Sequence, residues 1–285
     1  MLRAVFSLGT IAIVSLALIP LQWLAVRFEW PLRRRIPTFY HRFVCRVLGI
    51  RITEIGYRIG AHPLLIVSNH TSWLDISVIT AVAPVVFVAK SEVARWPVFG
   101  LFAKLQRSVF VDRSRRQRTA EVNIEIAERL TGGDPVVLFG EGTSSDGNRV
   151  LAFRTALIGA AGDALAQADH GKQVWLQPLS VAYTGLLGLP LDRHARNRVA
   201  WYGGAPLWPH FSWLVARGAV DVVVTWGEPI AYGAFSDRKA VARRLERAVR
   251  RHTVAALRGK SADPRPETAG EDDVTANSFL PGKAL

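Results

Sequence analysis

The stretch Ile66-Val67-Ser68-Asn69-His70-Thr71-Ser72-Trp73-Leu74-Asp75 (IVSNHTSWLD) decides how the middle of this 285-residue chain is interpreted. An apolar, β-branched run stops at a polar pair, Asn69 and His70, and an amphipathic segment begins at about Asp75. This order predicts a buried strand that ends just before His70, followed by a short connection and a helix. Because open α/β sheets bind ligands beyond the carboxyl ends of their strands, we expect His70 at a ligand-binding edge.

The spacing of His70 and Asp75 allows two interpretations. Ser72 to Asp75 fits an S-x-x-D capping box, in which Asp75 only caps a helix and His70 only ends a strand. In the other interpretation, the Asp75 carboxylate binds one ring nitrogen of His70 and leaves the other nitrogen free to accept a proton. Such a positioned general base accelerates a reaction by ~10²–10⁴-fold. The spacing alone leaves both interpretations open.

The rest of the chain alternates short β-branched runs with helical patterns. This alternation predicts an α/β fold in which helices flank a largely buried mixed sheet. A capping pattern at Ser114 predicts a helix that continues through Leu130, and Ser236 is expected to cap a last helix that ends at about Leu257. The predicted strands lie at residues 64–68, 85–89, 108–111, 135–139, 174–182, 198–202 and 220–226.

The amino-terminal segment has the composition of a membrane helix. Residues 4–26 carry no charge and exceed the ~20 residues that a helix needs to cross a bilayer. Arginines cluster after this segment, at residues 27 and 33–35, which predicts that the rest of the chain faces the cytosol. Pro20 and Gln22 leave open a helix that lies in one leaflet. A cleaved signal peptide is the less favoured alternative, because no A-x-A-like site follows.

Charge and composition divide the chain into three expected parts. Residues 1–52 are expected to form membrane-anchoring helices, because the second one is basic and amphipathic, although that pattern also fits an ordinary core-facing helix. Residues 53–260 form the α/β domain, and residues 261–285, with two basic and five acidic groups, form a disordered tail. The overall charge of +13 predicts an anionic partner, and we favour a membrane surface over nucleic acid because no nucleic-acid-binding motif appears.

Several kinds of site are excluded or unsupported. Cys45 is the single cysteine, so the chain has neither an intrachain disulfide nor a cysteine-based zinc site, and we expect this thiol to be buried as a small apolar group. The sequence contains no G-x-S-x-G, P-loop or H-E-x-x-H motif, and no G-x-G-x-x-G in a strand-to-helix turn. We therefore expect neither a bound metal nor a cofactor.

Residues 69–75 (NHTSWLD) resemble the N-H-x-x-x-x-D motif of the glycerolipid, or lysophospholipid, acyltransferase family, which includes the 1-acylglycerol-3-phosphate acyltransferases. Further segments follow in the order of that family, and the likeness covers residues 64–230. Residues 90–100 resemble its second stretch, residues 109–113 (VFVDR) its F-I-D-R block, residues 139–143 (FGEGT) its F-P-E-G-T block and residues 177–181 (QPLSV) its fourth block.

This resemblance implies a membrane-bound enzyme that moves a fatty acyl group from a thioester, on acyl carrier protein or coenzyme A, to the free hydroxyl of a lysolipid. The catalytic domain would lie on the cytosolic side of the inner membrane. His70 would be the base and Asp75 its orienting partner, and main-chain amides near Gly140 and Gly142 would bind the oxyanion. The substrate-binding residues that it implies are Asn69, Arg113, Gly140, Glu141, Gly142 and Thr143.

Alternatives remain for two of these assignments. The glycines also fit a simple turn after a strand. Arg113 matches the acceptor-binding arginine of the family, but it also fits a surface salt bridge.

Two positions depart from the family pattern. Gly140 replaces a proline, and Ser144 replaces an arginine that binds phosphate. The second change argues against lysophosphatidic acid as the acceptor, unless Arg149 or Arg154 supplies the cation. Residues 140–153 (GEGTSSDGNRVLAF) instead resemble the branch that acylates lyso-ornithine lipid, whose head group is a zwitterionic amino acid.

Three functions therefore remain under consideration. We favour acylation of lyso-ornithine lipid, with Asp146 facing the ammonium group of the acceptor. Acylation of lysophosphatidic acid to phosphatidic acid is the alternative within the same family. A non-catalytic basic protein that coats membrane or nucleic acid is the alternative of another class.

Overall fold

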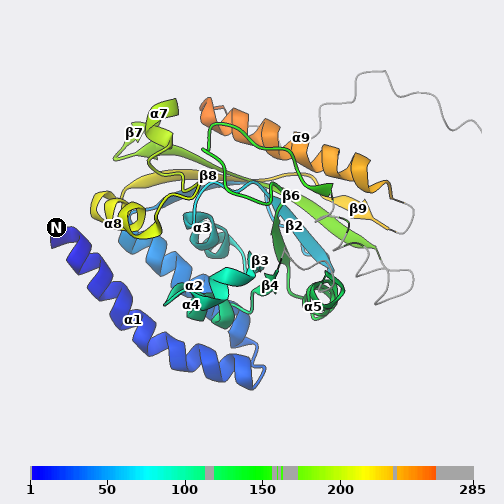
Figure 1. Cartoon of the computed structure of the whole chain (residues 1–285), viewed down its shortest axis with the longest axis horizontal. Helices are drawn as coiled ribbons and strands as arrows, with labels where there is room; N and C mark the ends of the chain where they lie inside the picture. The colour runs from blue at the N-terminus through cyan, green and yellow to red at the C-terminus, as the bar shows by residue number, and fades with distance from the viewer. Residues whose placement is uncertain are drawn as a thin grey trace, which may run out of the picture.

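The computed structural model describes residues 2–112, 119–155, 159, 162, 173–233 and 236–260, and the statements below refer to these residues (Figure 1). Its centre is a twisted sheet with the strand order β1-β8-β6-β2-β5-β3-β4, and β7 and β9 pair with β6. The strands are β1 (Arg51–Ile55), β2 (Leu64–Ser68), β3 (Val86–Lys90), β4 (Val109–Val111), β5 (Val136–Phe139), β6 (Val174–Leu186), β7 (Leu189–Pro190), β8 (Val220–Trp226) and β9 (Ile230–Tyr232).

The sheet is mixed, which confirms the predicted fold class. β2 pairs in parallel with β5 and β6, whereas β6 pairs antiparallel with β8 and β9. Every residue of β2 and β5 is buried, as expected for parallel strands covered on both faces. The predicted strand at residues 198–202 is wrong, because this segment is a loop in which Val199 N and Ala200 N donate to the Arg196 carbonyl.

Helices cover both faces of the sheet. In β2, Ile66 belongs to the core shared with α2, α3 and α8, whereas Val67 belongs to the core shared with α5 and α9. Figure 1 shows the same layers, with α1 outermost on the α2–α3 side. The helices are α1 (Leu2–Arg27), α2 (Leu32–Leu48), α3 (Leu74–Val82), the 3₁₀ helix η1 (Ser91–Arg95), α4 (Phe99–Leu105), α5 (Thr119–Thr131), α7 (Arg193–Arg196), α8 (Leu207–Arg217) and α9 (Arg238–Leu257).

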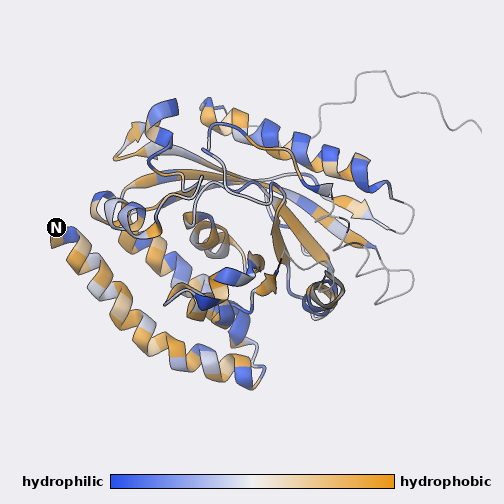
Figure 2. Ribbon diagram, viewed as in Figure 1, coloured by the Kyte–Doolittle hydropathy of each residue, from blue (hydrophilic) through white to orange (hydrophobic). Residues whose placement is uncertain are grey.

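Helix α1 is long and apolar enough to cross a membrane, yet it lies along the body of the protein. Its most apolar window is only 11% buried, and Figure 2 shows apolar residues along its whole length. At its start, the Arg3 guanidinium donates to the carbonyls of Val215 and Leu48 (both 2.9 Å). Towards its end, Gln22 Nε2 donates to the Leu105 carbonyl (2.8 Å). Both ends of α1 are therefore attached to the α/β body.

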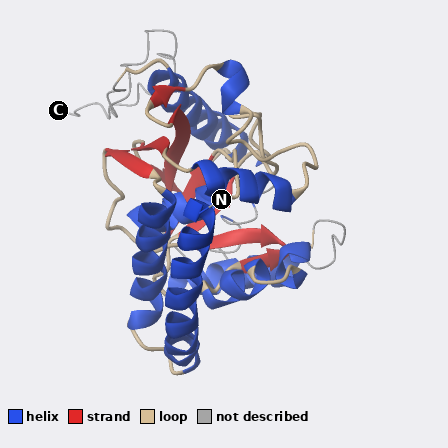
Figure 3. Cartoon of the chain, turned by 90° about the vertical axis from the view of Figure 1, so that its left-hand side faces the viewer, coloured by secondary structure: helices blue, strands red, loops and turns tan. Residues whose placement is uncertain are grey.

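Helix α2 is part of the same core as the sheet. It lies beside α1, as Figure 3 shows, and packs against α3. Leu48 and Cys45 are buried in the core on that face, and burial raises the pKa of the Cys45 thiol to about 12. This confirms that Cys45 is a buried apolar group. The expected boundary at residues 52/53 falls inside β1, and the expected tail at residues 261–285 lies outside the described residues.

The last helix begins one residue later than the sequence pattern predicted. Asp237, rather than Ser236, is the N-cap of α9, because its carboxylate accepts from Lys239 N. The Ser236 hydroxyl instead accepts from Gly233 N (3.0 Å). The predicted cap at Ser114 lies outside the described residues.

A buried ion pair connects the turn before β4 to the turn before β5. The Arg107 guanidinium donates two hydrogen bonds to the Asp134 carboxylate (2.6 and 2.8 Å), and Arg34 of α2 donates a third (2.7 Å). Burial by itself raises the pKa of Asp134, but the two guanidinium groups hold it below its ordinary value. The network therefore joins α2 to the edge of the sheet that carries β4.

Replacing the shared carboxylate should destabilise the protein. We expect Asp134→Ala to lower the free energy of unfolding by about 3 kcal/mol, because the buried Arg107 would lose its counter-charge. Urea denaturation followed by circular dichroism measures this change. Asp221→Ala is the matched control, since it removes a two-bond contact with the exposed Arg51 and should change the stability little. Equal losses in both variants would contradict the assignment.

Candidate active site

His70 lies in the connection between β2 and α3, at the edge where we expected a ligand site. Its ring Nδ1 is 2.8 Å from Asp75 Oδ2, and Asp75 is fully buried in the first turn of α3. The His70 side chain remains 20% exposed, and within the described chain its Nε2 has no hydrogen-bond partner. The contact with Asp75 therefore orients the imidazole and uses Nδ1, so Nε2 is the ring nitrogen that remains for another partner.

Asp75 also accepts hydrogen bonds from the main chain, so the two interpretations of the spacing are compatible. Its Oδ2 accepts from Thr71 N (2.7 Å) and Ser72 N (3.0 Å) as well as facing the imidazole. The other half of the predicted capping box is missing, because Ser72 Oγ has no hydrogen-bond partner in the described part of the chain. Asp75 thus fixes the strand-to-helix turn and the histidine at once.

Tyr183 makes a contact with Asp75 that the sequence did not predict. Its hydroxyl donates to Asp75 Oδ1 at 2.6 Å, and the side chain is fully buried. Tyr183 and Val181 belong to one core cluster because alternate residues of β6 face α3. No local pattern in the sequence indicates this partner, because the contact depends on β6 lying next to β2.

The aromatic ring of Phe139 packs against one face of the His70 imidazole. Phe139, the last residue of β5, stacks on His70 with ring centroids 4.0 Å apart and an interplanar angle of 18°. Phe139 in turn stacks on Phe87 at 5.9 Å. The ring of His70 is therefore held by Asp75 along one edge and by Phe139 across one face.

The buried Glu141 carboxylate links two main-chain segments by hydrogen bonds. One carboxylate oxygen accepts from His70 N (2.9 Å) and the other from Leu151 N (2.6 Å). Burial is the main cause that raises the pKa of Glu141 to about 7, and the nearby charges of Asp75 and Asp146 add to it, against the two hydrogen bonds. Glu141 therefore positions the His70 main chain, whereas the resemblance had assigned it to the acceptor site.

The two glycines of the F-G-E-G-T segment do not offer free amides in this structure. Gly140 N donates to the Ser68 carbonyl (2.9 Å), and Gly142 N donates to the Phe139 carbonyl (3.0 Å). Close packing requires a glycine at position 140, since an added Cβ would lie 2.7 Å from the Phe153 ring. Gly142 adopts a φ of 68°, which favours glycine. This geometry supports the turn interpretation of both glycines over the oxyanion role.

Asn69 is likewise engaged by the main chain. Its amide oxygen accepts from Val181 N and its amide nitrogen donates to the Val181 carbonyl, both at 2.9 Å. The side chain is 2% exposed. Asn69 therefore joins the end of β2 to β6 and does not face solvent, in contrast to the predicted substrate contact.

The loop after Glu141 contacts the connection that holds His70, and it carries the predicted residues Thr143 and Arg149. Ser145 N donates to the His70 carbonyl (2.8 Å), which ties the loop to the connection that holds the imidazole. Arg196, the last residue of α7, is buried, and its guanidinium donates to Asn148 Oδ1 of this loop (2.5 Å). Thr143 and Arg149 are exposed on the same loop. Arg113 lies outside the described residues.

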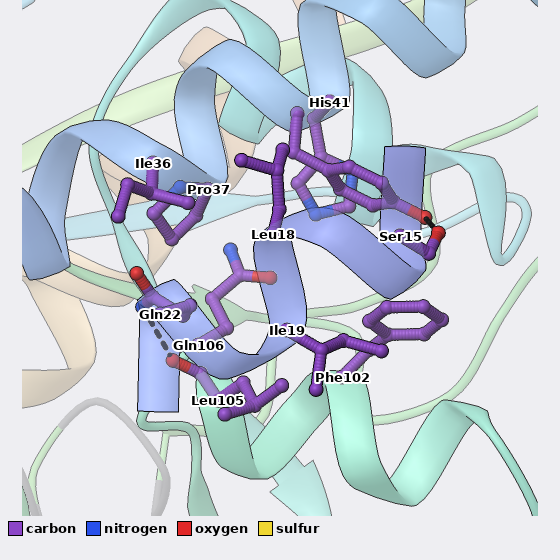
Figure 4. Close-up of a pocket in the computed structure, with 11 residues that line it drawn as sticks. Ser15, Leu18, Ile19, Gln22, Ile36, Pro37, His41, Phe102, Leu105 and Gln106 are labelled. Atoms are coloured by element: carbon purple, nitrogen blue, oxygen red, sulfur yellow. Dashed lines mark hydrogen bonds between the residues drawn. The ribbon is translucent and has the colours of Figure 1, made fainter. Parts of the chain in front are cut away.

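Two hollows in the described part of the chain, of about 40 and 420 Å³, are not lined by His70 or Asp75. Within the described chain no group of three His, Cys, Asp or Glu side chains could hold a metal ion. A cavity of about 40 Å³ lies between α1, α2 and α4 and is lined by residues such as Leu18, Ile36 and Phe102 (Figure 4). Ligand pockets measure about 300–1,000 Å³, so this cavity is too small for a lipid.

Comparison with known proteins identifies the family. A family model described as Acyltransferase matches residues 49–182. A lyso-ornithine lipid O-acyltransferase of Brucella abortus (strain 2308) is 48% identical over 259 residues, which cover 91% of this chain and 97% of that protein. Another, of Rhizobium meliloti (strain 1021), is 41% identical over 94% of this chain and 93% of that protein.

The fold agrees with a solved structure of an acyltransferase. The crystal structure of the 1-acyl-sn-glycerophosphate acyltransferase of Thermotoga maritima has a TM-score of 0.63 at 19% identity, and covers 92% of this chain and 98% of that chain. This likeness concerns the fold alone. The similarity over nearly the whole length of the two relatives confirms the family that the sequence motifs indicated, and this chain is therefore a member of the acyltransferase family.

Proposed function

We propose that this acyltransferase moves a fatty acyl group from an acyl thioester to the hydroxyl of lyso-ornithine lipid, with His70 as the general base. The observation that carries the proposal is the contact of 2.8 Å between His70 Nδ1 and the buried Asp75 carboxylate, at the end of a buried parallel strand. The contact orients the imidazole so that Nε2 is the atom available for proton transfer.

The proposed reaction needs no covalent enzyme intermediate. His70 Nε2 removes the proton of the acceptor hydroxyl as its oxygen attacks the thioester carbonyl carbon. A C–O bond forms and the carbonyl oxygen becomes an oxyanion. The C–S bond then breaks, and the thiol leaves with the proton that the imidazolium returns. Asp75 stabilises the imidazolium between these steps, and Tyr183 and the Thr71 and Ser72 amides keep the carboxylate in place.

The head group of the acceptor is proposed to bind at the loop that follows Glu141. Asp146 is half-buried there and accepts only from Asn148 within the described residues, so its charge suits a substrate ammonium group. Arg149 is exposed on the same loop and suits a carboxylate. The extensive similarity to two lyso-ornithine lipid O-acyltransferases favours this acceptor over lysophosphatidic acid.

We further propose that the enzyme is held at the cytosolic face of the inner membrane with α1 lying in one leaflet. The exposed apolar surface of α1 needs an apolar environment, and large exposed side chains such as Phe6, Ile13 and Leu16 occur along it. The attachments of Arg3 and Gln22 to the body favour a helix parallel to the membrane surface over one that crosses it.

Removal of the base should abolish turnover without releasing the protein from membranes. We expect His70→Ala to lower the rate of lyso-ornithine lipid acylation by about 10²–10⁴-fold. The exposed His194→Ala is the matched control and should keep the wild-type rate. Turnover is measured as product formed from a radiolabelled acyl thioester. Membrane attachment is measured by co-sedimentation of the protein with vesicles. Undiminished turnover by His70→Ala would refute the catalytic role, and turnover of lysophosphatidic acid alone would refute the acceptor.

Tyr183 should act as a positioning residue for the His70–Asp75 pair. In Tyr183→Phe, Asp75 loses a donor and attracts the imidazolium more strongly, so we expect kcat to fall about tenfold and the acid limb of the pH–rate profile to move to higher pH. Tyr40→Phe is the matched control, since it also removes a hydroxyl contact, to Ser15 at 2.8 Å. A pH profile that is unchanged in both variants would show that Tyr183 has a structural role only.

Glu141 should make the stability depend on pH. Because its folded pKa of about 7 lies above the ordinary value of 4.5, the folded state holds a proton that the unfolded state releases between these pH values. Stability from this group is therefore present below pH 4.5 and is lost as pH rises towards 7.

The variant Glu141→Gln lacks this titration. We expect the free energy of unfolding of the wild type to fall relative to this variant by up to about 3 kcal/mol between pH 4.5 and 7. Urea denaturation at both pH values measures the difference. Glu128→Gln, on the exposed face of α5, controls for the loss of one acidic side chain. Parallel pH dependences in the wild type and Glu141→Gln would contradict the assignment.

A further inference from the structure

A cluster of four aromatic side chains lies directly beside the catalytic connection. Trp73 precedes α3, Phe99 begins α4, and Trp208 and Phe211 lie on α8. The Trp73 ring is 5.3 Å from Phe211 and 6.5 Å from Phe99, and Trp208 is 5.9 Å from Phe211 and 6.1 Å from Phe99, between centroids. We call these four residues the aromatic portal. Trp73 is three residues from His70, so the portal adjoins the proposed base.

Hydrogen bonds attach this region to the site. Trp73 Nε1 donates to His210 Nδ1 (3.0 Å), which fixes the indole against α8. Trp201 N donates to the Thr71 carbonyl (2.8 Å), next to His70. The portal is therefore held in place relative to the imidazole.

The outer side of the portal is exposed and apolar. Trp208 is 58% exposed, and Val98 and Leu101 on the neighbouring turn and helix α4 are 57% and 46% exposed. Both α4 and α8 pack against α1, the helix whose apolar surface is also exposed (Figure 1). Exposed apolar side chains therefore occur on α1 and on the two neighbouring helices that carry the portal.

A strained turn places the apolar residues of this surface. Val98 adopts φ 65° and ψ −60°, a region that β-branched residues rarely enter, and Phe99 N donates to the Pro97 carbonyl (2.7 Å). The turn exposes Val98 while Phe99 joins the cluster. Strain of this kind persists where the surrounding structure holds it and is concentrated at functional sites.

We propose that the aromatic portal binds the acyl chain of the lysolipid acceptor as the acceptor moves between the bilayer and His70, with Val98, Leu101 and Trp208 inserted in the membrane interface. This inference rests on the proposed lysolipid acylation. The acceptor hydroxyl must reach a side chain in a polar site while its acyl chain stays in apolar surroundings. Tryptophan suits such a boundary, because its large ring is apolar and its N–H is polar.

Changes in the portal should affect turnover of an acceptor in a bilayer more than turnover of an acceptor dispersed in water. The purified full chain would be assayed with long-chain lyso-ornithine lipid in vesicles and with a short-chain, water-dispersed form of the same lipid. We expect Trp208→Ala and Val98→Asn to lower turnover of the vesicle acceptor about tenfold, as loss of an apolar contact does. Turnover of the dispersed acceptor should stay within about twofold of the wild type.

The variant Val98→Asn guards against a folding artefact. Asparagine tolerates positive φ better than valine, so this change removes the apolar side chain and relieves strain at the same time. Leu187→Asn is the matched control, because Leu187 also has a positive φ (56°) and is 51% exposed, but it lies on the β6–β7 hairpin. The proposal is overturned if the control loses vesicle turnover as strongly, or if the portal variants lose both activities equally or neither.

A second measurement is independent of catalysis. Brominated lipids quench tryptophans that enter a bilayer, so the quenched fraction of the fluorescence should be smaller in Trp208→Phe than in the wild type. An unchanged quenched fraction overturns the inserted portal. If the wild type acylates neither lipid, the proposed function fails, and the quenching result still decides whether this surface enters the membrane.

Discussion

The structure around the site depends on a single buried carboxylate. Asp75 is fully buried and receives hydrogen bonds from the Thr71 and Ser72 amides and from Tyr183, in addition to its contact with His70. A buried charge is tolerated only when it is paired and hydrogen-bonded, so each of these donors must be present in the folded state. The constraint couples the β2–α3 connection to β6, and it orients the imidazole as a consequence of satisfying the acid.

Main-chain hydrogen bonding also accounts for two other buried polar residues near His70. Asn69 and Glu141 use their side chains to bind main-chain groups of Val181, His70 and Leu151. These contacts close the end of a buried sheet, where unpaired amides would be costly. A polar residue next to the base is thus able to act by holding the backbone that carries the base, without touching the substrate.

Many of the large exposed apolar side chains lie on one face of the sheet. Helix α1 and the exposed parts of α4 and α8 form an apolar side, whereas α9, on the opposite face of the sheet, exposes arginines such as Arg243, Arg244 and Arg247. The overall positive charge is therefore not confined to the segment next to α1. His70 and Asp75 lie next to the central sheet, where β2 ends and α3 begins.

The sequence by itself determined the fold class, most strand positions, the burial of Cys45 and the family, because these follow from local periodicity and from short motifs. It did not determine the partner of Tyr183, 108 residues from Asp75, or the use of the Gly140 and Gly142 amides. It also failed at residues 198–202, where main-chain hydrogen bonds to Arg196 replace strand pairing. Only tertiary structure decided these features, since strand order and the competition for buried hydrogen-bond partners bring together residues that no local pattern relates.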